Sequence, residues 1–173
     1  MHMTRRSSRA ARGLLAAAML MLMMGCQSVE PPDYTTIADA DAVKSTRSEM
    51  MSFFTTAAEL ASSAVGGGEL RNGESVVGTT CGEPYDESFE TLEIGGSFLA
   101  KGRTLEEVLD QVSSSWEKQD WEVTVTAEDR VSLKTTTSTG VDVLASATLQ
   151  EVAGDPESIG VSLKALTGCL KLP

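Results

Sequence analysis

The stretch Ile159-Gly-Val-Ser-Leu-Lys-Ala-Leu-Thr-Gly-Cys-Leu170 decides the fold class, because its residues alternate in character along the chain. One predicted face carries Ile159, Val161, Leu163, Ala165, Thr167 and Cys169, and the other carries Ser162, Lys164 and Leu166. A period of two is typical of a strand in an antiparallel sheet that is covered on one side. The C-terminal stretch therefore predicts a sheet with one buried face.

Upstream segments extend this sheet. The further strand-like segments are Ser75–Cys81, Phe89–Ala100, Trp121–Ala127, Arg130–Thr137 and Val141–Val152. The breaks at 128–129, 138–140 and 154–156 are short enough for hairpins.

Two segments have helical periodicity instead. Between Asp39 and Val65 the apolar stripe consists of Val43, Met50, Phe54, Ala57, Ala61 and Val65, and Gly66-Gly67-Gly68 ends the helix. This stripe is also compatible with a membrane-lying or partner-binding surface, although few basic residues accompany it. A second helix begins at the capping box of Thr104 and Glu107 and aligns Leu105, Val108, Leu109, Val112 and Trp116.

The order of these elements predicts the architecture. Two helices alternate with strands, and the last strands are joined by tight turns. We expect an α+β domain, a meandering antiparallel sheet of about five or six strands with two helices packed on one face.

The N-terminal segment has the parts of an export signal. Four arginines and no acid precede the apolar run Leu14–Met24, which is too short to span a bilayer as a permanent helix. The run ends in Leu22-Met23-Met24-Gly25-Cys26-Gln27, which resembles the lipobox of bacterial lipoproteins. The resemblance implies cleavage before Cys26, an acyl anchor on its sulfur, and export by the general or the twin-arginine route. An ordinary secretory cleavage site beside an unmodified cysteine remains the alternative.

These features divide the chain into a leader (1–25), an acylated cysteine with a tether containing Pro31-Pro32 (26–38), and one domain (39–173). The chain has 173 residues and net charge −11, and subtracting the 25 leader residues leaves 148. The leader holds four of the 14 basic residues and none of the 25 acids, so the remainder carries a charge of −15. An acidic surface repels nucleic acid and anionic lipid. We therefore expect that the protein has no nucleic-acid partner and that acyl chains, rather than a basic patch, hold it at the membrane.

Two cysteines remain for the domain, Cys81 and Cys169. In an exported protein, an even pair is most simply joined by a disulfide, which would close a loop of about 88 residues. Two buried free thiols are the alternative. Neighbouring strands would be needed to bring the two residues together, and the sequence does not establish that adjacency.

A wider resemblance follows from the lipobox, the proline-bearing tether, the long first helix, the mid-chain cysteine, the Trp116–Val125 stretch and the closing Thr167-Gly168-Cys169. Together these are similar to small actinobacterial cell-envelope lipoproteins of uncharacterised function. The resemblance implies an envelope location and a disulfide, and it carries over no catalytic residue.

Candidate chemical sites are weak. The only histidine, His2, belongs to the leader, which removes imidazole-based mechanisms from the domain. Ser115 and Lys118 match the S-x-x-K spacing of penicillin-recognising enzymes, but the partner motifs S-D-N and K-T-G are missing. Glycosidases use paired carboxylates, and the pairs Asp86–Glu87 and Glu106–Glu107 are of that type. A chain with 25 acidic residues inevitably contains such pairs, so we interpret them as solvated surface.

Other residues have simpler structural explanations than ligand binding. Gly66-Gly67-Gly68 lacks the lysine of a phosphate loop, and Asp39 with Asp41 suits helix capping better than a cation. Trp116 and Trp121 could stack on a ligand, but both fall on apolar patterns that predict core positions. We predict no catalytic residues, metal or cofactor.

Three functional classes follow. The favoured one is a lipid-anchored, non-catalytic envelope protein with a binding or structural role. The second is a carrier of lipid or another apolar small molecule in a pocket between helices and sheet. The third is a small hydrolase that uses Ser115 or carboxylates.

Overall fold

The computed structural model describes residues 34–73, 75–81, 88–119 and 121–173, all within one compact unit, Pro32–Pro173. Its elements follow the order β1 (Tyr34–Thr36), α1 (Ala40–Val65), β2 (Arg71–Asn72), β3 (Val77–Thr80), β4 (Phe89–Lys101), α2 (Leu105–Glu117), β5 (Glu122–Ala127), β6 (Arg130–Thr136), β7 (Asp142–Val152), β8 (Asp155–Thr167) and β9 (Cys169–Lys171). The predicted α+β class is confirmed.

The sheet differs from the predicted meander. The described strands form one nine-stranded mixed sheet in the order β1-β9-β4-β8-β7-β6-β5, and β2 and β3 pair with β4. The expectation of five or six antiparallel strands is therefore wrong, because β1 runs parallel to β9. A simple meander is also excluded, because β4 lies beside β8 rather than β5. The helix α2 follows β4 and leads to β5, which lies at the opposite end of this strand order from β1. The strands β6, β7 and β8 then return by hairpins.

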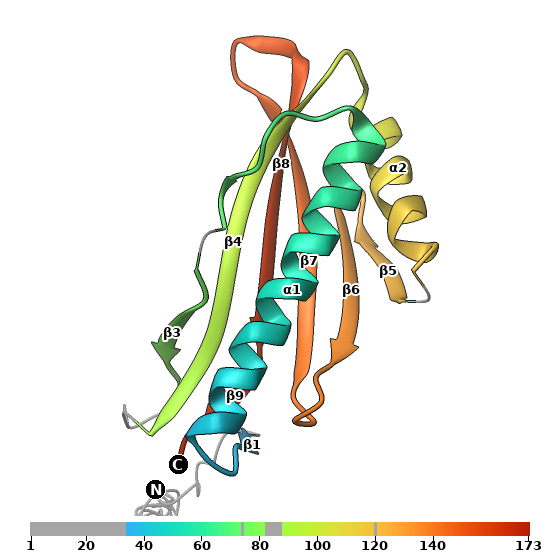
Figure 1. Ribbon diagram of the computed structural model, residues 1–173. Helices are drawn as coiled ribbons and strands as arrows, with labels where there is room; N and C mark the ends of the chain where they lie inside the picture. The colour runs from blue at the N-terminus through green and yellow to red at the C-terminus, as the bar shows by residue number, and fades with distance from the viewer. Residues whose placement is uncertain (1–33, 74, 82–87, 120) are drawn as a thin grey trace, which may run out of the picture. The chain divides into compact units, whose positions relative to one another are not determined.

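Both helices lie on the same face of the sheet (Figure 1). The inward side chains of β4, β6, β7 and β8 meet the apolar stripes of α1 and α2 in one core. The largest fully buried side chains include Trp116, Phe54, Met50, Leu92 and Leu133. Apolar burial between these layers is the main stabilising contribution to such a fold.

The helix boundaries agree with the sequence prediction. Asp39 is the N-cap of α1, and its carboxylate accepts a hydrogen bond from the amide of Ala42 at 2.8 Å. Gly66 ends α1 in the left-handed region at φ 61°, where glycine has no steric penalty. The predicted stripe is buried except for Val43, which is half-buried. Core packing, the simpler of the two explanations, is what the structure shows for this stripe.

The C-terminal strand prediction needs a correction at Gly168. Glu93 pairs with Leu166 and Glu90 with Leu170, so four steps along the C-terminal segment oppose three along β4. The extra residue is a β-bulge that divides the predicted strand into β8 and β9. Because each register step exchanges the two faces, Leu170 becomes buried and Cys169 only half-buried, contrary to the predicted alternation.

Two other boundaries shift. The break predicted at 154–156 is a shorter turn at Ala153–Gly154, with Gly154 at φ 81°, so Pro156 falls within β8. The predicted tether also ends earlier than expected. Tyr34–Thr36 forms β1 beside β9, and the amide of Ile37, a residue 3% exposed, donates to the carbonyl of Lys171 at 3.0 Å. The strand β1 was not predicted from the sequence, because a strand of three residues is too short to show a periodic pattern.

No helix in the described part of the chain combines the length and the apolar character that crossing a membrane requires.

Candidate functional site

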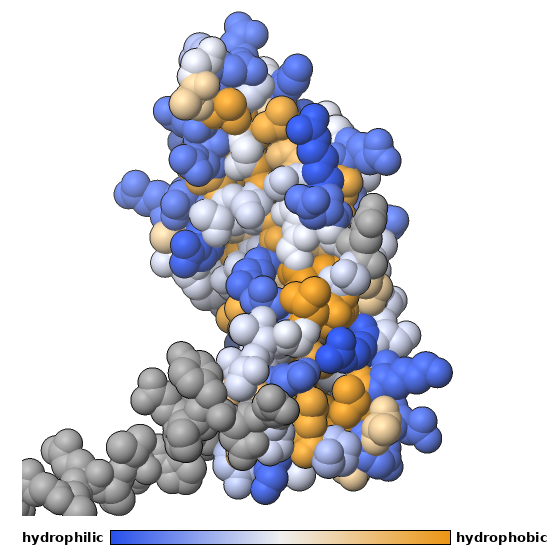
Figure 2. Space-filling view, turned by 90° about the vertical axis from the view of Figure 1, so that its left-hand side faces the viewer, coloured by the Kyte–Doolittle hydropathy of each residue, from blue (hydrophilic) through white to orange (hydrophobic). Residues whose placement is uncertain are grey.

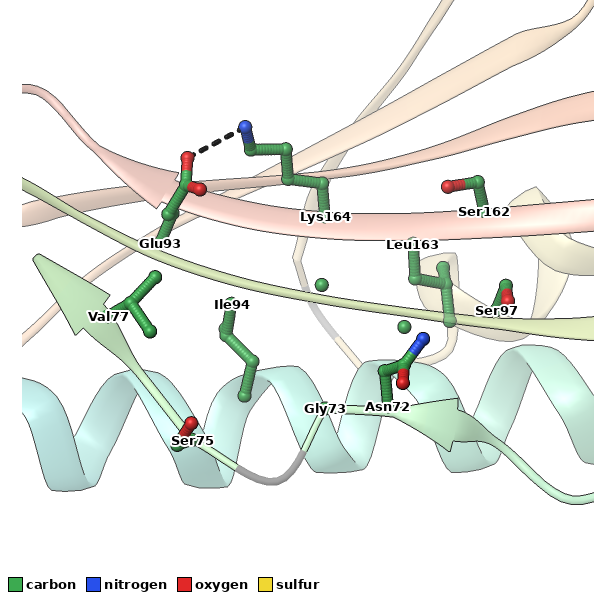
Figure 3. A pocket seen from close by; sticks show the side chains of 12 residues that line it. Asn72, Gly73, Ser75, Val77, Glu93, Ile94, Ser97, Ser162, Leu163 and Lys164 are labelled. Atoms are coloured by element: carbon green, nitrogen blue, oxygen red, sulfur yellow. Dashed lines mark ion pairs between the residues drawn. The ribbon is translucent and has the colours of Figure 1, made fainter. Parts of the chain in front are cut away.

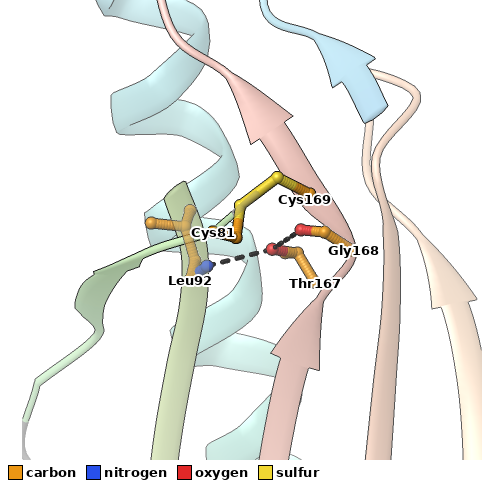
Figure 4. The surroundings of a disulfide bond; sticks show 5 residues. All are labelled: Cys81, Leu92, Thr167, Gly168 and Cys169. Carbon is orange, nitrogen blue, oxygen red and sulfur yellow. Dashed lines mark hydrogen bonds between the residues drawn. A yellow bond between two sulfur atoms is a disulfide. The ribbon is translucent and has the colours of Figure 1, made fainter. Parts of the chain in front are cut away.

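The predicted disulfide joins Cys81 to Cys169, whose Cα atoms are 5.9 Å apart (Figure 4). Cys81 follows β3 and Cys169 begins β9, and both strands pair with β4 rather than with each other. The disulfide therefore does not need β3 and β9 to be neighbours, because pairing with β4 brings Cys81 and Cys169 together. The bulge is held at this point: Thr167 Oγ1 accepts from the amide of Leu92 at 3.0 Å and donates to the carbonyl of Gly168 at 2.8 Å. The predicted lipidation residue, Cys26, lies outside the described residues.

Both tryptophans pack as core residues. Trp116 is fully buried, and its indole Nε1 donates to the carbonyl of Ala57 at 2.9 Å, which joins α2 to α1. Trp121 is half-buried and meets Phe53 edge to face, with ring centroids 5.3 Å apart. Neither ring is presented as an exposed platform for a ligand.

Ser115 and Lys118 have structural positions in α2. Ser115 is 9% exposed, and its hydroxyl donates to the carbonyl of Val112 at 2.7 Å. Lys118 is the C-cap residue of the helix. The structure shows no hydrogen bond between the two side chains, so the nucleophile and base of an S-x-x-K site are not brought together.

The predicted capping box is confirmed at the start of α2. Glu107 accepts from the amide of Thr104 at 2.8 Å, and Thr104 Oγ1 accepts from the amide of Glu107 at 3.2 Å. The backbone hydrogen bond from Thr104 lowers the pKa of Glu107. Glu106 is exposed in the same turn, whereas Asp86 and Glu87 lie outside the described residues. Within the described ranges, no three histidine, cysteine or acidic residues are grouped to hold a metal ion.

A polar clasp between α1 and the β6–β7 hairpin was missed by sequence reasoning. Glu49 accepts from the amide of Ser138 at 2.7 Å and also from the Ser138 hydroxyl. Thr46 Oγ1 lies 2.7 Å from Thr139 Oγ1. The hydrogen bonds from Ser138, the side-chain bond foremost, lower the pKa of Glu49. The two segments are about 90 positions apart in the chain, so no local pattern could have revealed this contact.

The helix-free face of the sheet carries the most distinctive polar surface. Ser97, Ser162 and Thr148 are direct partners on β4, β8 and β7 and form a row across the sheet, here called the hydroxyl row. Arg71 on β2 pairs with Ser97 at one end of the row, and Arg130 on β6 pairs with Thr148 at the other. The Nε of Arg130 donates to Thr148 Oγ1 at 3.2 Å.

Two adjoining hollows follow this row. One, of about 230 Å³, is lined by Arg71, Gln150, Gly160 and the hydroxyl row, among others. The other, of about 630 Å³, shares Ser97 and Ser162 with the first and extends to Glu93 and Lys164. In Figure 3, Ile94 points toward α1, whereas Glu93 and Lys164 project from the opposite side of the strands.

Charge in the larger hollow is partly neutralised, since Lys164 Nζ lies 2.8 Å from Glu93 Oε2. Figure 2 views the molecule from the side on which β3 and β4 lie in Figure 1, and hydrophilic and hydrophobic residues are interspersed there. The arrangement offers hydrogen-bond donors, acceptors and positive charge to a ligand, and the described lining contains no imidazole or free thiol.

Three comparisons with known proteins find no counterpart: no family model, no curated protein and no solved structure matches this chain.

Proposed function

We propose that this chain is an exported lipoprotein, anchored by acyl chains on Cys26 to the extracytoplasmic face of the cell membrane, with a non-catalytic binding or structural role in the envelope. The observation that carries the proposal is the Cys81–Cys169 disulfide. Such bonds form and persist in oxidising compartments outside the cytosol, which is the destination that the basic and apolar leader specifies.

A binding role is supported by the distribution of polar groups. The helix-covered face is filled by core side chains, whereas the opposite face carries the hydroxyl row and two open hollows. The absence of an enzymatic role stays a prediction. No observation supports the carrier hypothesis, because Met50, Phe54 and Trp116 occupy the layer where an apolar ligand would lie.

Anchoring is tested by the variant Cys26→Ser, with Ser28→Ala as a matched control in the same segment. We expect the Ser variant to leave the membrane fraction and the control to remain there, because only Cys26 can carry the thioether-linked lipid. Fractionation of cells with detection of the protein measures this. Retention of Cys26→Ser in the membrane would contradict the acyl anchor and indicate an uncleaved leader.

The binding role needs its own experiment. Crosslinking of intact envelopes followed by capture of the protein should recover an envelope component, and capture from Cys26→Ala cells provides the background. Recovery of nothing above that background would count against a binding role, even with the anchor in place.

A further inference from the structure

We propose that the hydroxyl row and its flanking arginines bind an extended anionic polyol, a flexible chain of hydroxylated units joined by phosphate. The inference rests on the proposed function, because it names the ligand class of an exported binding protein. Its structural basis is the placement of a guanidinium group at each end of a line of hydroxyl groups on the helix-free face.

The row is continuous across five strands. Arg71 pairs with Ser97, Ser97 with Ser162, Ser162 with Thr148, and Thr148 with Arg130. Neighbouring strands are about 4.8 Å apart, so roughly 19 Å separates the Cα atoms of the two arginines. A ligand that contacts both arginines must therefore be extended, and it must pass over the three hydroxyl groups.

The charges of the two arginines are available to a ligand. Arg71 is exposed and makes no side-chain hydrogen bond or ion pair within the described residues, and Arg130 is exposed with its one bond to Thr148. The neighbouring Lys164 is already paired with Glu93. The net charge of −11 repels anions at a distance, so an anionic ligand on this face must gain its affinity from short-range contacts with these two guanidinium groups.

Arg71 lies where two adjacent hollows meet, which favours a ligand that extends across both. Its side chain lines the 230 Å³ hollow and also an adjacent hollow of about 460 Å³, which reaches Leu99 and Lys101 at the end of β4. Gly160 lines the smaller hollow without a side chain. A chain could therefore lie across the sheet in contact with Arg71 without displacing a side chain of the core.

The lining chemistry favours phosphate and hydroxyl groups over flat rings. Guanidinium groups form paired, charge-assisted hydrogen bonds with phosphate oxygens, and serine and threonine hydroxyls both donate and accept. Phe98, the aromatic residue in the described lining, is 3% exposed and belongs to the core, so the row offers no ring for stacking. A flexible phosphate-linked chain matches cations at the two ends and hydroxyls between them.

The test uses the full-length mature protein, purified from membranes in an uncharged detergent, and a short glycerol-phosphate oligomer as the probe. Titration calorimetry at low and at high salt should show binding that weakens as salt rises, because charge attraction contributes to it. Glycerol 3-phosphate monomer and inorganic phosphate should each bind at least about tenfold more weakly, since neither can reach both arginines.

Variants identify the surface. Arg71→Gln and Arg130→Gln should each weaken oligomer binding about tenfold or more. Lys44→Gln removes an exposed cation from α1 instead and should have no effect. Thr148→Val with Ser162→Ala removes two hydroxyls without changing the charge and should weaken binding while leaving its salt dependence unchanged. All five positions are exposed or half-buried, and circular dichroism checks that each variant is folded.

The outcomes separate this inference from the proposed function. Equal affinity for monomer and oligomer, or an undiminished affinity in the Arg71→Gln, Arg130→Gln double variant, would overturn the extended site. Absence of oligomer binding at low salt would overturn it as well. In all three cases, membrane release of Cys26→Ser and recovery of a crosslinked envelope component would still uphold the anchored binding protein.

Discussion

At the scale of single residues, this protein depends on polar groups that satisfy backbone atoms far away in the sequence. Trp116 bonds to the carbonyl of Ala57, Thr167 to the amide of Leu92, and Glu49 to the amide of Ser138. Each bond satisfies a backbone group that water would otherwise have to reach. These contacts are therefore the positions at which a conservative substitution has the clearest consequence.

Glu49 should make stability depend on pH. Its folded-state pKa lies below the ordinary value of 4.5, chiefly because the Ser138 hydroxyl donates to the carboxylate. A lowered pKa stabilises the folded state above that ordinary value, and the contribution is lost as the pH falls through the folded-state pKa. We expect Glu49→Gln to lower the free energy of unfolding at pH 7 by more than it does near about pH 3.

Urea unfolding of both proteins at each pH measures this difference. Glu59→Gln is the control, because Glu59 is exposed on the same helix and makes no ion pair or side-chain hydrogen bond among the described residues. A difference between wild type and Glu49→Gln that is the same at both pH values would contradict the assignment.

At the scale of elements, the two helices are defined by their ends and the strands by their partners. The capping box of α2 and the glycine C-cap of α1 are local, so both could be predicted from adjacent residues. The bulge at Gly168 could not. It arises because β4 pairs with β8 and β9 in registers that differ by one residue, and the alternation of the C-terminal stretch itself continues without interruption.

Thr104→Ala should destabilise the domain by about 1 kcal/mol, the usual cost of removing an N-cap hydroxyl. The amide of Glu107 would lose its acceptor, and the reciprocal bond from Glu107 would be weakened. Ser114→Ala is the control, since Ser114 is exposed within the same helix and alanine is the better helix former. Chemical unfolding of both variants measures the costs, and equal stability of Thr104→Ala and wild type would argue against the cap.

At the scale of the whole molecule, β4 is the central strand of the fold. It pairs with β2 and β3 at one edge and with β8 and β9 at the other, and its inward side chains meet α1. The disulfide spans this strand, joining the segment after β3 to β9. Cys81 and Cys169 therefore link two segments that both lie beside β4.

Removing the disulfide should cost about 2–5 kcal/mol, because the reduced unfolded chain gains freedom across an 88-residue separation. We expect Cys81→Ala and Cys169→Ala to be destabilised similarly, and the double variant to lose little more than either one. Thermal and urea unfolding under oxidising conditions measure these values. A double variant as stable as wild type would show that pairing with β4 alone holds the two segments.

The lipobox-like segment, the two helices with their caps, the strand-like segments and the pairing of two cysteines were open to prediction, because each depends on composition or on residues within a few positions of one another. Only the tertiary structure placed β4 beside β8, added β1 in parallel, and shifted the register at Gly168. It also aligned Arg71, Ser97, Ser162, Thr148 and Arg130 in one row. Strand partners and registers are set by packing between distant segments, and the alternation of one strand leaves the identity of its neighbours undetermined.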